Sequence, residues 1–207
     1  MTNQLEFRGK WTDIIWPVIL IALAGIFTLG IAVPWAFISY RKKVFSLTYY
    51  RGSSMSYDGV GGEYFGQMIV GLLLTLVTIG FYALLGYYEV RLLKYDVEHT
   101  ILPDGRRMQF RGQALDFFGQ YLVIGILSTL TLGIYAFWGY ARMRRFTLEH
   151  CYIDGKQLRF SGTGGQFLGI SIVIFLLTLV TLGIYSFLGF STVKTLRWDS
   201  ENTLIPD

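Results

Sequence analysis

The chain has 207 residues, of which 53% are hydrophobic, 17% aromatic and only 15% charged. Soluble domains average about 25% charged residues, so this composition argues against an ordinary water-surrounded domain and predicts extensive contact with lipid. The net charge of +4 would suit nucleic acid, but the Lys and Arg residues follow the apolar runs without any nucleic-acid-binding motif, so we expect no nucleic-acid partner.

Four long apolar runs follow one another along the chain, at residues 14–40, 64–88, 117–141 and 167–193. Each exceeds the roughly 20 residues that a helix needs to cross about 30 Å of hydrocarbon. Strands are disfavoured, because a lone strand in lipid leaves its backbone groups without hydrogen bonds and the runs do not alternate. The sequence therefore predicts an all-α integral membrane fold with four homologous transmembrane helices.

The runs share the motif Thr-Leu/Ile-Gly, and its four threonines are 50, 53 and 50 residues apart. The motif residues are Thr28 and Gly30, Thr78 and Gly80, Thr131 and Gly133, and Thr181 and Gly183. Glycine would let a neighbouring backbone approach, and the threonine hydroxyl would kink the helix; a break that exposes backbone groups to a ligand is the alternative. Packing is preferred, because four copies suit a structural role. We predict a single membrane domain of four repeats, at about residues 7–58, 59–109, 110–159 and 160–207.

The connectors between the runs are polar and carry turn signals. Asp104-Gly105 and Asp154-Gly155 lie between short alternating segments, and Asp-Gly favours the type I′ turn because both central residues need positive φ. We therefore expect short β-hairpin-like connectors.

Polar residues recur at fixed distances before the motif. Asp13, Glu63, Asp116 and Gln166 lie fifteen residues before the threonines, and Gln67 and Gln120 lie eleven before. The first set fits helix-start chemistry better than an ion or proton path, because it lies at the ends of the runs. The two glutamines would hydrogen-bond between helices. Glu89 has no equivalent, and we expect it to pair with Arg91 or Lys94.

The predicted topology places equal numbers of basic residues on the two sides of the membrane. With four single spans, nine Lys and Arg residues fall on each side, so the positive-inside rule gives no orientation. Dual insertion, charges that serve interfaces, or runs that bend at the motif and return would each explain the balance. Runs of 25 to 27 residues are short for two crossings, so single, kinked spans are preferred.

Unit three carries Phe110-Arg111-Gly112, then Thr131-Leu132-Gly133-Ile134-Tyr135 with Trp138, and then Asp154-Gly155 before Phe160-Ser161-Gly162. This unit resembles the YjgN-like family of bacterial inner-membrane proteins, domain-of-unknown-function family 898, and the likeness covers most of the chain. Ala32 and Leu85 depart from the pattern in units one and two. The resemblance implies a multi-pass protein of the bacterial inner (cytoplasmic) membrane, and it implies no known activity or site.

No enzyme motif is present, and one cysteine with two histidines offers few catalytic or metal constellations. We therefore expect no enzyme, catalytic residue, metal or cofactor. The preferred hypothesis is a non-enzymatic scaffold or accessory subunit that contacts the lipid bilayer and a membrane-protein partner or further copies of itself. The alternative is a small transporter or channel with pseudo-inverted repeats.

Overall fold

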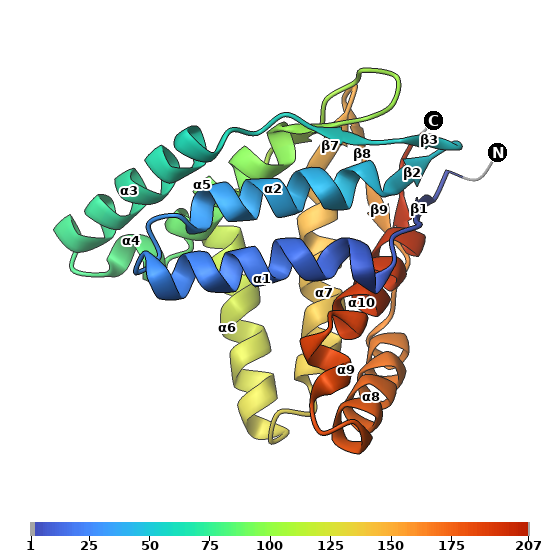
Figure 1. Ribbon diagram of the computed structural model, residues 1–207. Coiled ribbons are helices and arrows are strands. Elements are labelled where there is room, and N and C mark those ends of the chain that lie inside the picture. Colours follow the sequence, from blue (N-terminus) through green and yellow to red (C-terminus); the bar gives the residue numbers. More distant parts are fainter. Residues whose placement is uncertain (1–2, 207) are drawn as a thin grey trace.

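The computed structural model describes residues 3–206 and shows four consecutive units built on one plan (Figure 1). In each unit a short strand leads into a helix of 17 residues, the chain turns back at the Thr-Leu/Ile-Gly motif, and a second helical arm returns to a strand beside the first. We call the two arms of a unit a helical hairpin. We call the residues around its turn, 27–31, 77–81, 130–134 and 180–184, the hairpin ends.

The helices within the described residues are α1 Trp11–Phe27 and α2 Val33–Ser46, α3 Gly61–Val77, α4 Phe81–Leu84 and α5 Tyr87–Glu98, α6 Ala114–Leu130 and α7 Ala136–Glu149, and α8 Gly164–Val180, α9 Ile184–Phe187 and α10 Phe190–Glu201. The strands are β1 Leu5–Phe7, β2 Thr48–Tyr50, β3 Ser53–Ser54, β4 Ser56–Tyr57, β5 Thr100–Ile101, β6 Gln109–Phe110, β7 Cys151–Ile153, β8 Lys156–Gln157, β9 Arg159–Phe160 and β10 Thr203–Leu204. The second arm is one helix in units one and three. In units two and four it is broken at Gly86 and Gly189, which adopt left-handed conformations.

Each unit is closed by an antiparallel strand pair at the base of its hairpin. The pairs are β1 with β2, β4 with β5, β6 with β7, and β9 with β10, and they align Phe7 with Thr48, Tyr57 with Thr100, Phe110 with Cys151, and Phe160 with Thr203. Side chains alternate along these strands: Leu5 and Phe7 are buried and Glu6 is exposed. The two chain ends lie together (Figure 1), because Gln4 bridges to Leu204 and the Ile205 N–H donates to the Asn3 carbonyl.

The strand connectors contain the glycine turns expected from the sequence. Asp154 and Gly155 both have positive φ between β7 and β8, as the type I′ turn requires. In the longer connection from β5 to β6 only Gly105 of the Asp104-Gly105 pair has positive φ. Because a type I′ turn needs positive φ at both central residues, this turn is not of that type.

The core lies among the strands and the helix turns next to them. The main buried cluster includes Leu5, Tyr50, Met55, Leu102, Phe110, Phe117, Ile153, Leu158, Phe160, Trp198 and Ile205. Gly112 shows how tightly the rings pack there, since a Cβ at that position would lie 2.5 Å from the Phe110 ring and 2.7 Å from the Phe117 ring. We call this layer of strands and buried rings the base.

The predicted all-α integral membrane fold with four transmembrane helices is wrong. Across residues 3–206, every helix is too short or too polar to cross a membrane, and small sheets accompany the helices. Each apolar run is not one helix but a 17-residue arm, a turn and the start of a returning arm. The preference for single spans over returning runs is wrong for the same reason. The multi-pass topology and the inner-membrane localisation, which the family resemblance also implied, are contradicted by the same finding, since no helix within residues 3–206 could cross a membrane.

Candidate functional site

The Thr-Leu/Ile-Gly motif ends the first arm with a Schellman turn. In unit three, Leu132 has φ of 52° and Gly133 φ of 89°. The Gly133 N–H donates to the Ser128 carbonyl at 2.7 Å, and the Leu132 N–H donates to the Thr129 carbonyl at 3.2 Å. This is the double hydrogen bond that satisfies the last carbonyls of a helix. A leucine or isoleucine in the left-handed region is uncommon, yet all four units have one at this position.

The motif threonine connects the two arms of each hairpin. The Thr131 hydroxyl donates to the Leu127 carbonyl at 2.7 Å and accepts the Tyr135 N–H at 2.9 Å. Thr28, Thr78 and Thr181 make the same pair of contacts. One side chain thus satisfies a carbonyl at the end of the first arm and an N–H at the start of the second.

The motif glycines do not serve close helix packing. A Cβ built at Gly30, Gly80, Gly133 or Gly183 meets nothing within 4 Å, and all four have φ between 88° and 91°. Glycine reaches this backbone conformation at little steric cost. The four residues therefore allow the turn, and the neighbouring backbone expected from the sequence is not there.

The hairpin ends expose large apolar side chains. Leu29, Ile79, Leu132 and Leu182, which occupy the same motif position, are each at least 90% exposed. Their neighbours in the same turns are also exposed, at Phe27, Val77, Leu130 and Val180 and at Ile31, Phe81, Ile134 and Ile184. Contiguous apolar surface of this kind marks an interaction site.

Charge is confined to the opposite end of each hairpin. Residues 14–40, 64–88, 117–141 and 167–193 contain no Asp, Glu, Lys or Arg, whereas basic residues follow each run. Exposed aromatic side chains lie along the arms between these zones, including Trp16, Trp35, Trp138 and Tyr140. Figure 1 shows all four hairpins pointing away from the strands, with units one and two directed to the left and units three and four directed downward.

The four residues predicted at the helix starts have different surroundings. Asp13 accepts the Lys10 N–H at 2.9 Å and lies 3.8 Å from the Lys43 ammonium. Gln166 forms a reciprocal capping box with Thr163. Asp116 is exposed, and no side-chain partner for it is seen in the described part of the chain. Asp13 and Gln166 therefore have the geometry of helix caps.

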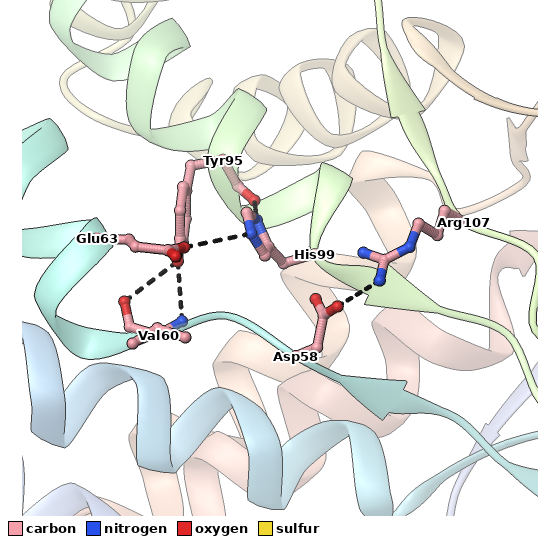
Figure 2. A network of polar contacts seen from close by, with 6 residues as sticks. All are labelled: Asp58, Val60, Glu63, Tyr95, His99 and Arg107. Carbon is pink, nitrogen blue, oxygen red and sulfur yellow. Dashed lines mark hydrogen bonds and ion pairs between the residues drawn. The ribbon is translucent and has the colours of Figure 1, made fainter.

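Glu63 instead joins a polar network at the base of unit two (Figure 2). The Tyr95 hydroxyl lies 3.0 Å from the Glu63 carboxylate and accepts the Val60 N–H at 2.9 Å. The His99 ring stacks on Tyr95, its Nδ1 donates to the Tyr95 carbonyl at 2.7 Å, and its Nε2 lies 3.8 Å from Glu63. Because the carbonyl can only accept, Nδ1 is the ring nitrogen that carries the proton in this hydrogen bond. The network ties the start of α3 to the end of α5.

The remaining predicted polar residues do not converge. The Gln120 amide oxygen accepts the Arg142 Nε–H at 2.8 Å within the hairpin of unit three. Gln67 is half-buried without a side-chain hydrogen bond in the described residues. Burial and the nearby Glu89 carboxylate raise the pKa of the Tyr121 hydroxyl in the next unit. Within the described residues no ion pair joins Glu89 to Arg91 or Lys94 as the sequence suggested, and Lys94 instead lies near Glu98. Residues 3–206 also bring together no three His, Cys, Asp or Glu side chains that could hold a metal ion.

Two ion pairs between units were not predicted from the sequence. Arg41 binds Asp96 through two hydrogen bonds, one of 2.6 Å, and Arg144 binds Asp199 in the same way, again with one of 2.6 Å. Both pairs join residues 55 positions apart. The pairs link unit one to unit two and unit three to unit four. An alignment of halves rather than single units would have shown the recurring Arg and Asp.

Residues 105–159 and residues 156–207 each match one family model, described as a bacterial protein of unknown function (DUF898). The two matches fall on units three and four, so the family model covers about one unit. No curated protein and no solved structure matches the chain.

Proposed function

Since the chain belongs to the bacterial family of unknown function DUF898, we propose a function from its own geometry: a non-enzymatic scaffold whose hairpin ends insert into one leaflet of a lipid bilayer. In this proposal no helix crosses the membrane. The base stays in water and is available to a protein partner or to further copies of the chain.

The observation that carries the proposal is the exposure of the four hairpin ends. A leucine or isoleucine at the outermost position of each turn is at least 90% exposed, and the arms behind it have no charge. Burial of one such side chain in an apolar phase contributes about 1.5–3 kcal/mol. Four ends on one molecule add these contributions.

The dimensions suit one leaflet. The charge-free part of α1 covers 14 residues, from Ile14 to Phe27, and rises about 21 Å at 1.5 Å per residue. One leaflet contributes about 15 Å of hydrocarbon. The two pairs of hairpins point in different directions (Figure 1), so a single bilayer plane meets them at a tilt, which shortens the depth that each reaches.

The positions of the aromatic and basic residues suit the membrane–water interface. Trp and Tyr favour the membrane interface because a ring can contact hydrocarbon while its polar atom stays hydrated. Arg and Lys beside an anionic bilayer each contribute about 1 kcal/mol. Basic residues follow all four runs, as in Arg41-Lys42-Lys43 and Arg144-Arg145.

The scaffold part of the proposal rests on the kind of contact that repeats. The interunit ion pair recurs in both halves of the molecule, whereas the strand pair and the threonine bridge recur in all four units. These contacts hold the hairpins in place. The transporter hypothesis presupposed successive spans that cross the bilayer. No specific observation in the structure favours it.

Vesicle flotation tests the proposal. The wild-type chain is expected to float with phosphatidylcholine vesicles, and Leu132→Glu with Leu182→Glu is expected to lower the partition coefficient at least about tenfold, because a carboxylate in hydrocarbon costs several kcal/mol. The matched control places the same charge on the exposed strand residue Ser54 (S54E) and should float as wild type does. The proposal would be refuted if the wild type failed to float, or if the variant with Leu132→Glu and Leu182→Glu floated as well as the wild type.

A further inference from the structure

A cavity of about 530 Å³ lies where the first and last units meet. Its walls come from the junction of β1 and α1 on one side and from α8, α9 and α10 on the other. The two units contact each other here, since α10 packs on β1 and on α1. The volume falls within the range of about 300–1,000 Å³ that is usual for ligand pockets.

One part of the cavity lining is cationic. Lys10, Lys194 and Arg197 line it, with Glu201 as the one carboxylate among the lining residues. Within the described residues none of the three cations forms an ion pair. Three positive charges against one negative charge leave an excess that attracts an anion.

The other part of the lining is aromatic. The rings of Trp11 and Phe190 are 5.0 Å apart, and Phe190 stacks on Tyr185 at 5.2 Å. These rings extend from the cationic side of the cavity toward the hairpin of unit four, where the charge-free run ends at Val193. A ligand that suits both parts carries an anionic group and an apolar chain.

The seam between units two and three is the internal control, because it repeats the seam between units four and one. Gly86 there corresponds to Gly189, and Ala114 corresponds to Trp11. A Cβ at Gly86 would lie 3.1 Å from the Ala114 carbonyl oxygen, whereas nothing lies within 4 Å of one at Gly189. The small residue at the start of α6 lets the two units close, and the tryptophan at the start of α1 keeps the other seam open.

One of the equivalent cations differs in the same direction. Lys94, which corresponds to Arg197, lies 3.9 Å from the Glu98 carboxylate in the closed seam. Glu201 corresponds to Glu98, but no ion pair joins Arg197 to Glu201 in the described chain. The open seam thus combines space with unneutralised charge.

We propose that this cavity binds the headgroup of an anionic phospholipid, with the phosphate between Lys10, Lys194 and Arg197 and the first part of an acyl chain along Trp11 and Phe190. The inference rests on the proposed contact with a bilayer, whose lipid would enter from the hairpin side. The bound lipid fills the open seam and connects the first unit to the last.

The experiment measures binding of monomeric dihexanoyl phosphatidylglycerol to the purified full chain by tryptophan fluorescence, with dihexanoyl phosphatidylcholine and inorganic phosphate as comparison ligands. The anionic lipid is expected to bind at least about tenfold more tightly than either, since one charge-assisted hydrogen bond is worth about 1.5–3 kcal/mol. Lys194→Gln with Arg197→Gln should weaken its binding at least about tenfold. The matched control, Arg91→Gln with Lys94→Gln in the closed seam, should leave the affinity within about twofold.

Each alternative result overturns a definite part of the inference. Equal affinity for the two lipids, or no effect of the K194Q and R197Q pair, would remove the anionic site. Phosphate that binds as tightly as the lipid would assign the cations to a free anion instead. Soluble short-chain lipid tests the cavity without a bilayer, and flotation with phosphatidylcholine tests the hairpin ends without an anionic headgroup, so failure of the inference and failure of the proposed function are distinguishable.

Discussion

Phe117 and Leu132 belong to the same unit, fifteen residues apart, and have opposite surroundings. Phe117 is 1% exposed and lies between the rings of Phe110 and Phe146 at the base, whereas Leu132 is 94% exposed at the hairpin end. Both are apolar, and both positions repeat as Ile14 and Leu29 in unit one. The comparison teaches that the protein buries its apolar residues at the base and leaves those at the hairpin ends exposed.

The largest expected difference between the two regions is in folding stability. Phe117→Ala should lower the free energy of unfolding by about 3–5 kcal/mol, because it removes a buried ring and leaves a cavity. Leu132→Ala should change it by less than about 0.5 kcal/mol, since the side chain contacts little protein. Urea unfolding in the absence of lipid measures both. Equal losses would show that the hairpin end is packed in solution.

A smaller loss of folding stability is expected when an ion pair between two units is removed. Asp96→Asn should cost about 1.5–3 kcal/mol, because the partly buried Arg41 loses a charged hydrogen-bond partner. Asp199→Asn, the same change in the other half of the molecule, should cost a similar amount. Thermal melting of the two variants measures the effect, and an unchanged Tm in both would show that these pairs are not structural.

The threonine bridge within a hairpin should contribute about 1 kcal/mol. Thr131→Val keeps the shape but removes both contacts that connect α6 to α7. Thr129→Val is the matched control, because its hydroxyl bonds only the Gly125 carbonyl of its own helix. Hydrogen exchange at the Tyr135 amide should accelerate in T131V and not in T129V; equal exchange would assign the turn to Gly133 alone.

The base also protects its one thiol from reaction. Burial raises the pKa of the Cys151 thiol to about 12, although Arg144 acts in the opposite direction. The folded chain then keeps the thiol protonated while the unfolded thiol ionises near 8.5, so this group stabilises the fold less as pH rises from about 8.5 to 12. Alkylation by iodoacetamide at pH 8.5 should be at least about 100-fold slower in the folded protein than in denaturant. Similar rates would contradict burial of the base.

The sequence predicted the fourfold repeat, the type I′ turn at Asp154-Gly155 and the residues of the turning motif. It offered a reversal at Leu132-Gly133 only as an alternative to single, kinked spans, because hydropathy is equally high on both sides of the turn and a glycine in an apolar run also suits helix packing. A local signal could have predicted the reversal: in each unit the motif threonine is followed by two residues that end the helix.

The polar residues were predictable by type but not by partner. Asp13 and Gln166 could be placed at helix starts from spacing alone, since caps are local. Glu63 could not be joined to Tyr95 and His99 in the same way, because those residues lie more than thirty positions away on the returning arm. The Arg41 and Asp96 pair likewise depends on how the units pack, which no single run reveals.

The most direct test of the central claim is the depth of a fluorophore attached to the hairpin end in phospholipid vesicles. Leu132→Cys and Asp154→Cys, each made in a Cys151→Ser background, place the label at the exposed end and at the base of the same unit. We predict that lipids with nitroxides on the acyl chain quench the label at residue 132 and not the label at residue 154, and that water-soluble iodide does the reverse. A label at residue 132 that iodide quenches as strongly as the one at residue 154, with vesicles present, would contradict insertion of the hairpin ends.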